Sequence, residues 1–169
     1  MKKLALFLAF ILLVGVFAGC KGAGEAGASR SIENADGTLS DWMKDEIYEA
    51  FAKDYFEEYG ATPTKAQFGS WWDPQKPMSA TMRYYGTYDG YVMYSQDTGM
   101  EAYQEKEIAG FLFVYASVHI LKVYKDGEFY DLEELYNQGV IDDKAIEIAY
   151  NGYCRVEETI RRYRKENGI

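Results

Sequence analysis

Two Asp-Gly pairs, each placed between runs of β-forming residues, constrain the fold of this chain more than any other feature. The pairs are Asp89-Gly90 and Asp126-Gly127, and the runs beside them cover residues 81–88, 91–94, 118–124 and 129–130. Asp-Gly favours the type I′ turn, in which two residues join neighbouring antiparallel strands. The sequence therefore predicts two β-hairpins.

Further strands are expected between these two hairpins. Residues 103–109 and 111–115 are rich in β-forming side chains and are separated by Gly110, so they supply one or two strands. The connections are short, which favours antiparallel neighbours over crossovers. We expect an antiparallel meander sheet of four or five strands.

Helical patterns precede and follow the strands. Ser40 can cap a helix over residues 41–59, where acidic side chains crowd the first turns and large apolar side chains recur at helical spacing. Asp131 is expected to cap a short helix over residues 132–138, and Asp142 to begin a longer one. The predicted fold class is α+β, with an N-terminal helix, the meander sheet and C-terminal helices packed on the sheet.

The region between the first helix and the first hairpin is expected to be a long loop. Residues 61–79 contain all three prolines of the chain, and proline interrupts regular structure. The loop carries Trp71 and Trp72. Two neighbouring rings on an extended backbone point in opposite directions, so we expect one ring to face the core and the other to face solvent.

The N-terminus has the pattern of an export signal. Two lysines precede an apolar run over residues 4–17, which is shorter than the hydrocarbon core of a bilayer and is followed by Gly-rich polar sequence. Residues 17–20 read Phe-Ala-Gly-Cys, which resembles the lipobox of bacterial lipoproteins. The resemblance implies that residues 1–19 are a signal peptide and that Cys20 is the lipid attachment site.

The remaining chain is expected to form a tether and one domain. Residues 20–39 are rich in Gly, Ala and Ser and read as a lipidated Cys followed by a flexible tether. Residues 40–169 are long enough to form a single α+β globular domain. With this anchor, the protein would lie at the cell membrane and face the extracytoplasmic side.

Two segments of this domain are similar to a hairpin-helix module of uncharacterised Gram-positive secreted proteins. They are residues 83–90, which read RYYGTYDG, and residues 124–141, which read YKDGEFYDLEELYNQGVI. The resemblance supports the α+β fold. It implies no activity and no site residue.

Composition argues against several classes of function. The formal net charge of −9 disfavours nucleic-acid binding, because such proteins need a basic surface. One histidine and two cysteines disfavour zinc, haem and iron-sulfur sites, so no metal and no cofactor is expected. With Cys20 lipidated, Cys154 has no intramolecular partner and is expected to be a small buried apolar residue.

No catalytic motif stands out in the sequence. Acid-base catalysis needs two groups that converge in a cleft, and the adjacent acidic pairs of this chain fit solvated helix faces or first turns instead. His119 is expected to share the inward face of its strand with Leu121 and Val123. We therefore favour a non-enzymatic role over an enzymatic one, with no catalytic residue assigned.

Aromatic content is the remaining unusual feature, with 16 Tyr, 9 Phe and 3 Trp. Tyr and Trp suit both protein interfaces and sugar stacking, so the candidate ligand contacts are Trp71, Trp72 and Tyr85. The leading hypothesis is a lipid-anchored surface protein that binds another macromolecule, either a protein or a glycan. The alternative is a glycan-binding or glycan-processing accessory lipoprotein.

The assignment of Cys20 gives a direct prediction. Cys20→Ala removes the thiol that would carry the lipid, so the protein should move from the membrane fraction to soluble or unprocessed forms. Cell fractionation followed by immunoblotting measures this change, with Cys154→Ala as the matched control that stays in the membrane fraction. Unchanged partition of Cys20→Ala would contradict the lipid anchor.

Overall fold

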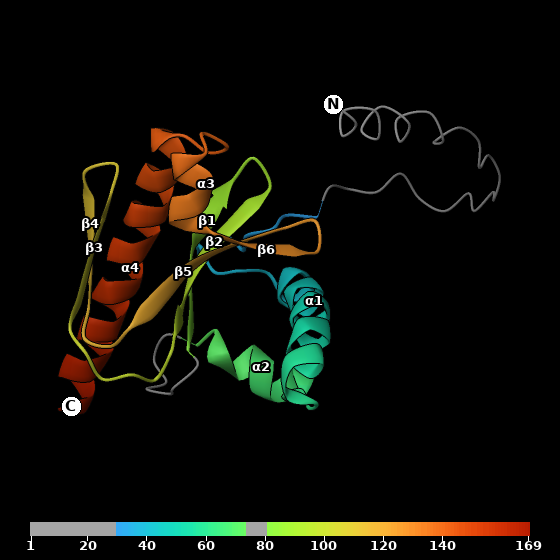
Figure 1. The fold of residues 1–169 in the computed structure, drawn as a ribbon. Coiled ribbons are helices and arrows are strands. Elements are labelled where there is room, and N and C mark those ends of the chain that lie inside the picture. The colour runs from blue at the N-terminus through green and yellow to red at the C-terminus, as the bar shows by residue number, and fades with distance from the viewer. Residues whose placement is uncertain (1–29, 74–80) are drawn as a thin grey trace, which may run out of the picture. The chain divides into compact units, whose positions relative to one another are not determined.

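The computed structural model describes residues 30–73 and 81–169 (Figure 1). The predicted signal peptide, the lipobox with Cys20 and residues 74–79 of the predicted loop lie outside the described residues. The elements follow in the order α1 (Asp41–Tyr59), α2 (Lys65–Trp71), β1 (Met82–Tyr88), β2 (Tyr91–Asp97), β3 (Gln104–Ile108), β4 (Phe111–Tyr115), β5 (His119–Lys125), β6 (Glu128–Asp131), α3 (Leu132–Asn137) and α4 (Asp143–Asn167).

The strands form a four-stranded antiparallel sheet in the order β1-β2-β5-β6 and a separate β3-β4 hairpin inserted between β2 and β5. The α+β class and the four-stranded sheet are confirmed. At the predicted hairpin turns, Asp89 and Asp126 have φ values of 47° and 51°, and the glycine after each also has a positive φ. This is the type I′ pattern, which Asp and Gly tolerate best.

A bulge in β1 changes which side chains face each side of the sheet. Tyr84 pairs with Tyr94, but Gly86 pairs with Met93, so Tyr85 is left without a partner in the register. Both Tyr85 and Gly86 therefore point to the side of the sheet that faces α4. A side chain at Gly86 would meet Ile148 of α4 at 2.8 Å.

Helices cover both faces of the four-stranded sheet, with α4 on one side and α1 and α2 on the other (Figure 1). The core on the α4 side joins the sheet to α3, α4 and the β3-β4 hairpin through Tyr85, Met93, Phe113, Leu121, Val123, Leu135, Ile146 and Ala149. The core on the α1 side contains Met43, Ile47, Phe68, Trp72, Met82, Tyr84, Val92, Tyr94 and Tyr124. The sheet thus contributes buried side chains from both of its faces.

Helix α4 approaches the sheet very closely at Gly152. A Cβ atom built on Gly152 would lie 1.6 Å from the carbonyl oxygen of Tyr85 and 2.5 Å from its Cα. No side chain fits in that space, because real Cβ contacts are longer than 3 Å. Gly152 therefore lets the backbone of α4 rest directly on the bulge of β1.

The predicted loop over residues 61–79 is wrong in part, because residues 65–71 form α2. Thr64 and Gln67 build a complete capping box, in which each side chain accepts a hydrogen bond from the other residue's backbone N–H. This cap starts the helix, and Pro63 precedes it without interrupting it. Ser40 is the N-cap residue of α1, as predicted, but its side chain makes no capping hydrogen bond.

Residues 31–39, which the composition assigns to the tether, are the first residues of the folded unit that begins at Ser31. Leu39 is 1% exposed, Glu33 forms an isolated β-bridge with Leu39, and the Trp42 indole N–H donates to the Ser31 carbonyl oxygen at 2.8 Å. The buried Leu39 side chain and these local hydrogen bonds therefore hold in place a segment whose composition resembles that of a linker.

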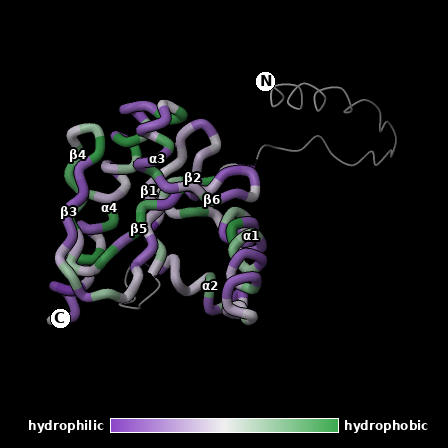
Figure 2. Tube along the Cα trace, in the orientation of Figure 1, coloured by the Kyte–Doolittle hydropathy of each residue, from purple (hydrophilic) through white to green (hydrophobic). Residues whose placement is uncertain are grey.

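Within residues 30–73 and 81–169, no helix is long and apolar enough to cross a membrane. Figure 2 shows both hydrophilic and hydrophobic residues along α1. The buried residues of this helix, Met43 and Ile47, are four positions apart and belong to the core on the α1 side of the sheet.

Gly152 provides a test of the contact between α4 and β1. Gly152→Ala should lower the free energy of unfolding by about 3 kcal/mol, because the added methyl group overpacks against the β1 backbone. Urea denaturation measures the change. Gly69→Ala in α2 is the control, since nothing lies within 4 Å of its Cβ position, and alanine there should stabilise by about 0.5 kcal/mol. Equal effects of the two substitutions would contradict the close contact.

Candidate functional site

A pocket of about 480 Å³ lies beside β1 and α4, and we call it the cationic pocket. This volume falls in the usual range for sites that bind small molecules. Five parts of the fold contribute to it: the segment before α1, α1 itself, the residues that follow α2, the beginning of β1, and α4. The described lining comprises Asp36, Gly37, Thr38, Leu39, Lys44, Trp72, Asp73, Arg83, Tyr84, Arg155, Val156, Thr159 and Arg162.

Helix periodicity explains why α4 contributes to the pocket. Arg155, Thr159 and Arg162 are spaced four and then three residues apart, which places them on one side of a helix. Tyr153 and Ile160 on the neighbouring side are buried. Helix α4 therefore presents an apolar side to the sheet and a polar side to the pocket.

The cationic side chains of the pocket are only partly neutralised. Arg83 forms an ion pair with Glu157, and Lys44 Nζ lies 3.1 Å from Asp41 Oδ1. Arg155 Nη2 donates to the backbone carbonyl oxygen of Gly37 at 3.1 Å. Within the described parts of the chain, neither Arg155 nor Arg162 has a carboxylate partner.

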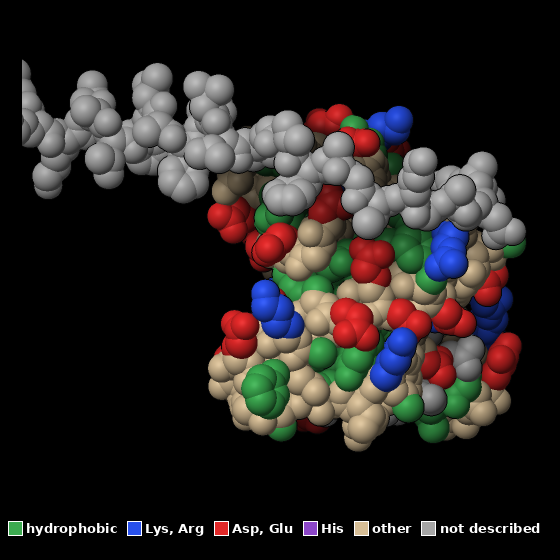
Figure 3. Space-filling model, turned by 90° about the vertical axis from the view of Figure 1, so that its right-hand side faces the viewer, with side chains coloured by type: hydrophobic (Ala, Val, Ile, Leu, Met, Phe, Trp, Pro, Cys, Tyr) green, Lys and Arg blue, Asp and Glu red, His purple; other side chains and the backbone are tan. Residues whose placement is uncertain are grey.

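This arrangement contrasts with the rest of an acidic protein. The chain has 27 Asp and Glu against 18 Lys and Arg, and acidic side chains are scattered over the face seen from the α1 side (Figure 3). The described lining of the pocket instead has four cationic and two acidic side chains. The pocket is therefore a local cationic region.

Three buried polar atoms without a hydrogen-bond partner belong to residues that line this pocket or adjoin its lining. Among the described residues, they are Ser40 Oγ, Trp72 Nε1 and Arg83 Nε. Trp72 and Arg83 line the pocket, and Ser40 follows Leu39 of the lining. Native proteins leave few such atoms, because each loses its hydrogen bonds to water without replacement.

The remaining polar groups of the lining are already engaged. The Tyr84 hydroxyl lies 2.7 Å from Thr87 Oγ1 and 3.3 Å from Glu33 Oε2, and burial raises the pKa of Tyr84 to about 12. Hydrogen bonds from the Thr38 hydroxyl and backbone N–H lower the pKa of Asp36, which keeps this carboxylate charged. Tyr84 thus stays neutral at physiological pH and is a poor proton donor.

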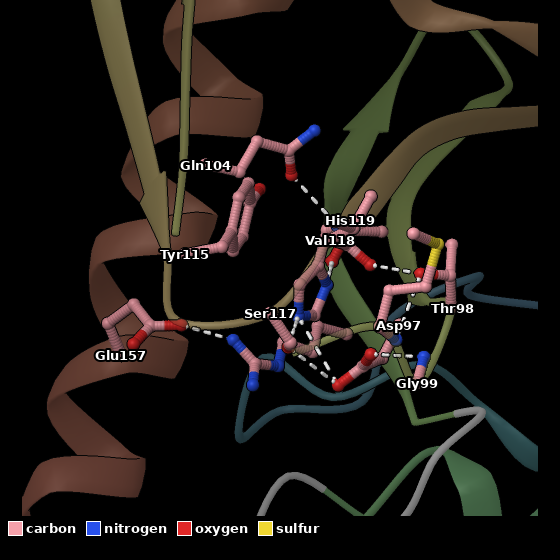
Figure 4. Close-up of polar contacts among 12 residues, drawn as sticks. Asp97, Thr98, Gly99, Gln104, Tyr115, Ser117, Val118, His119 and Glu157 are labelled. Atoms are coloured by element: carbon pink, nitrogen blue, oxygen red, sulfur yellow. Dashed lines mark hydrogen bonds and ion pairs between the residues drawn. The ribbon is translucent and has the colours of Figure 1, made fainter. Parts of the chain in front are cut away.

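A second polar cluster surrounds His119 on the side of the sheet that faces α4 (Figure 4). His119 Nδ1 lies 3.0 Å from Ser95 Oγ, and His119 Nε2 lies 3.3 Å from Ser117 Oγ and 3.6 Å from Asp97 Oδ2. The imidazole stacks on the Tyr115 ring, with 4.3 Å between the ring centroids. The inward position predicted for His119 is confirmed, with 2% of the residue exposed.

The hydrogen bonds continue from Ser95 into the core. The Tyr85 hydroxyl lies 2.7 Å from Ser95 Oγ and 3.0 Å from the Tyr115 hydroxyl. Ser117 donates to Asp97 Oδ2 at 2.9 Å. All of these groups are satisfied if the Tyr115 hydroxyl donates to the Tyr85 hydroxyl, Tyr85 donates to Ser95 Oγ, and Ser95 donates to His119 Nδ1. This pattern assigns the neutral His119 tautomer that has its proton on Nε2.

This cluster has the residue types of a hydrolase but not the arrangement. Ser95 is fully buried, so no substrate reaches its hydroxyl. Ser117 donates its proton to Asp97 rather than to His119, and a triad needs the histidine between the serine and the carboxylate. Burial and the positive charge of Arg83 lower the pKa of His119 to about 4, against the opposing effect of Asp97. His119 is therefore a weak base, and we interpret the cluster as a structural network.

Metal binding finds no support in the described parts of the chain. No group of three or more His, Cys, Asp or Glu side chains there could hold a metal ion.

The candidate ligand contacts named from the sequence do not form one site. Tyr85 is 1% exposed and hydrogen-bonded in the core, so it has no surface for a ligand. Trp72 is 9% exposed and packs on Tyr94, with 5.4 Å between the ring centroids, while it also lines the cationic pocket. Trp71 is half-buried and lines a different hollow with Tyr55.

The prediction of a buried Cys154 is wrong, because this residue is exposed on α4. It follows Tyr153, which is buried and hydrogen-bonded to the backbone of Val114. A step of one residue turns a helix by about 100°, so Cys154 is carried off the buried side. The spacing of apolar residues in the sequence around Cys154 is compatible with either a buried or an exposed position on the helix.

The sequence reasoning missed the arginines of the pocket. In the sequence, Arg162 lies near the C-terminal end of a predicted helix, where cations interact favourably with the helix dipole, so its presence there needs no ligand. The spacing of Arg155 and Arg162 on one side of the helix was the available signal. Gly37, whose carbonyl accepts from Arg155, and Arg83, which lines the same pocket, come from distant segments that no local pattern connects.

Comparisons with known proteins provide no further guide to this site. No protein-family model matches the chain, and no match is found among curated proteins or solved structures. The functional argument therefore depends on the geometry alone.

The buried His119 predicts a loss of stability in mild acid. In the unfolded chain this histidine binds a proton near pH 6.5, but the folded protein resists protonation until about pH 4. The free energy of unfolding should therefore fall by about 2 kcal/mol between pH 7 and pH 5, since the unfolded state binds more protons there. Urea denaturation at a series of pH values measures this.

The matched variant is His119→Gln, which removes the only histidine of the chain. It should be less stable than the wild type at pH 7, because Ser95 loses a buried partner. Its stability should change little between pH 7 and pH 5.5. An unchanged pH dependence in this variant would show that His119 is not the group responsible.

Proposed function

We propose that this protein is a non-enzymatic binding module, attached to the extracytoplasmic side of the cell membrane through Cys20, and that the cationic pocket is its ligand site. The single observation that carries the proposal is a pocket of ligand size in which two lining residues, Trp72 and Arg83, each have a buried hydrogen-bond donor without a partner. Such atoms are favoured where a ligand supplies the missing hydrogen bonds.

The polar groups of the pocket suit binding better than catalysis. Its cations are arginines and one lysine, and guanidinium groups do not exchange protons at physiological pH. Tyr84 has a raised pKa, and Asp36 has a lowered one. Neither group therefore has the pKa near neutrality that general acid-base catalysis requires.

The anchor and the pocket lie on the same continuous segment of chain. The proposed lipidation site at Cys20 precedes Ser31, where the folded unit begins, by 11 positions. The segment 36–39 then lines the pocket. A short tether of this kind would keep the ligand site close to the membrane, which suits a surface protein that captures molecules there.

A glycan-binding function is the second candidate, and one observation favours it. A separate hollow of about 330 Å³ is lined by the rings of Tyr55 and Trp71 together with the polar side chains of Thr62, Gln67 and Ser70. Half-buried aromatic rings beside hydroxyl and amide groups suit the stacking and hydrogen bonding of sugars. This hollow and the cationic pocket share no described lining residue.

A fragment screen by saturation-transfer NMR tests both candidates. The library should contain organic anions, cations, neutral molecules and short oligosaccharides, tested on the full chain in detergent. We expect ligands of the cationic pocket to lose at least tenfold in affinity in Thr159→Trp, because the larger ring fills the pocket. Oligosaccharide signals that disappear in Trp71→Ala would instead support the glycan-binding function.

The control is Glu158→Trp, which adds the same ring at an exposed position of α4 outside the pocket lining. It should leave every signal unchanged. If no fragment distinguishes Thr159→Trp from the wild type, the cationic pocket is not a ligand site and the proposal is wrong.

A further inference from the structure

The unpartnered atoms of the cationic pocket specify the kind of group that a ligand must bring. Trp72 Nε1 and Arg83 Nε are both hydrogen-bond donors, and neither side chain has an acceptor atom. Only an acceptor can satisfy them. Both atoms are shielded from water in this structure, so they meet an acceptor of a ligand only when the two side chains shift toward it.

The charges around these donors favour an anionic acceptor. Arg83 already shares its guanidinium with Glu157, but it presents Nε separately. Arg155 reaches only a backbone carbonyl, and Arg162 has no hydrogen-bond or ion-pair partner among the described residues. Guanidinium groups bind carboxylate and phosphate oxygens with paired, charge-assisted hydrogen bonds.

The walls of the pocket indicate more than an inorganic ion. Leu39, Trp72, Tyr84 and Val156 contribute apolar surface to the lining. A volume of about 480 Å³ exceeds the space that one carboxylate or phosphate group fills, and apolar walls favour a hydrocarbon or aromatic body. The ligand should therefore carry an anionic group on a small apolar skeleton.

The acidic side chains of the lining limit the charge of the ligand. Asp36 and Asp73 stand among the four cations, and Asp36 has a lowered pKa, which keeps it ionised. These carboxylates repel a ligand with many negative charges. Nucleic acids and polyphosphates therefore fit the pocket poorly. An anion with one or two negative charges matches the excess of two cationic side chains over acidic ones in the lining.

Resting on the proposed ligand site, we propose that the cationic pocket binds a small organic anion, in which one carboxylate or phosphate group sits on an apolar or aromatic body. The two side chains shift toward the ligand so that its anionic oxygens accept from Trp72 Nε1 and Arg83 Nε. The exposed Arg155 and Arg162 pair with the charge of the ligand. The body of the ligand packs on Leu39 and Val156.

Titration calorimetry on the full chain in detergent tests this with four probes of one shape. Benzoate and phenyl phosphate are the anions, benzyl alcohol is the neutral analogue and benzylammonium is the cation. At least one anion should bind ten times more tightly than benzyl alcohol, and benzylammonium should not bind. Affinity for the anion should fall as the salt concentration rises from 0.05 to 0.5 M, because salt screens the arginines.

Two substitutions connect the charge preference to the named groups. Arg162→Gln should weaken anion binding about tenfold, the effect of one lost charge-assisted contact. Trp72→Phe retains an aromatic ring but removes the N–H donor, and it should weaken binding several-fold. Arg161→Gln is the control, because Arg161 precedes Arg162 on α4 but lies outside the lining and pairs with Glu158. It should leave the affinity unchanged.

The outcomes separate this inference from the function on which it rests. Equal binding of benzyl alcohol and both anions, with loss in Thr159→Trp, would overturn the anion preference but leave the ligand site intact. Unchanged anion affinity in Arg162→Gln and Trp72→Phe would also overturn the inference. Absence of binding by both anions would overturn it too, whereas the fragment screen decides separately whether the pocket binds any ligand.

Discussion

The arrangement of this domain depends on the contact between Gly152 of α4 and the backbone of β1 at Tyr85. The missing side chain of Gly152 brings the helix backbone against the sheet, where any Cβ atom would collide with a carbonyl group. The bulge at Tyr85 turns that tyrosine toward the helix, into the core with Phe113 and Tyr153. Beyond Gly152, the same helix brings Glu157 to its ion pair with Arg83, near the beginning of β1.

The cationic pocket follows from the same contact. Arg155 and Thr159 are three and seven residues beyond Gly152, so the position of α4 on the sheet fixes where they face. Arg155 then binds the backbone of Gly37, which fastens the segment before α1 along the opposite wall. The pocket thus has walls from segments more than a hundred residues apart, and the helix contact sets the distance between them.

The two polar clusters of the domain differ in how well their groups are satisfied. Around His119 every hydroxyl has a partner, and the imidazole is kept neutral by burial, which makes this cluster a cross-link inside the core. At the cationic pocket, donors remain without acceptors, although Arg83 lies near both clusters. This difference is the basis for interpreting the first cluster as a structural network and for proposing the second as a ligand site.

Local patterns in the sequence determined most elements of the fold, and only the tertiary structure decided the site. The two Asp-Gly turns and the α1 boundaries were predictable, because turn geometry and helix spacing depend on neighbouring residues. The β3-β4 turn at Ala109 was less evident, since alanine rarely adopts its φ of 52°. The meeting of Gly37, Arg83 and Arg155 arises from the packing of α4 on the bulge of β1, and no local pattern encodes a distance between segments so far apart in the chain.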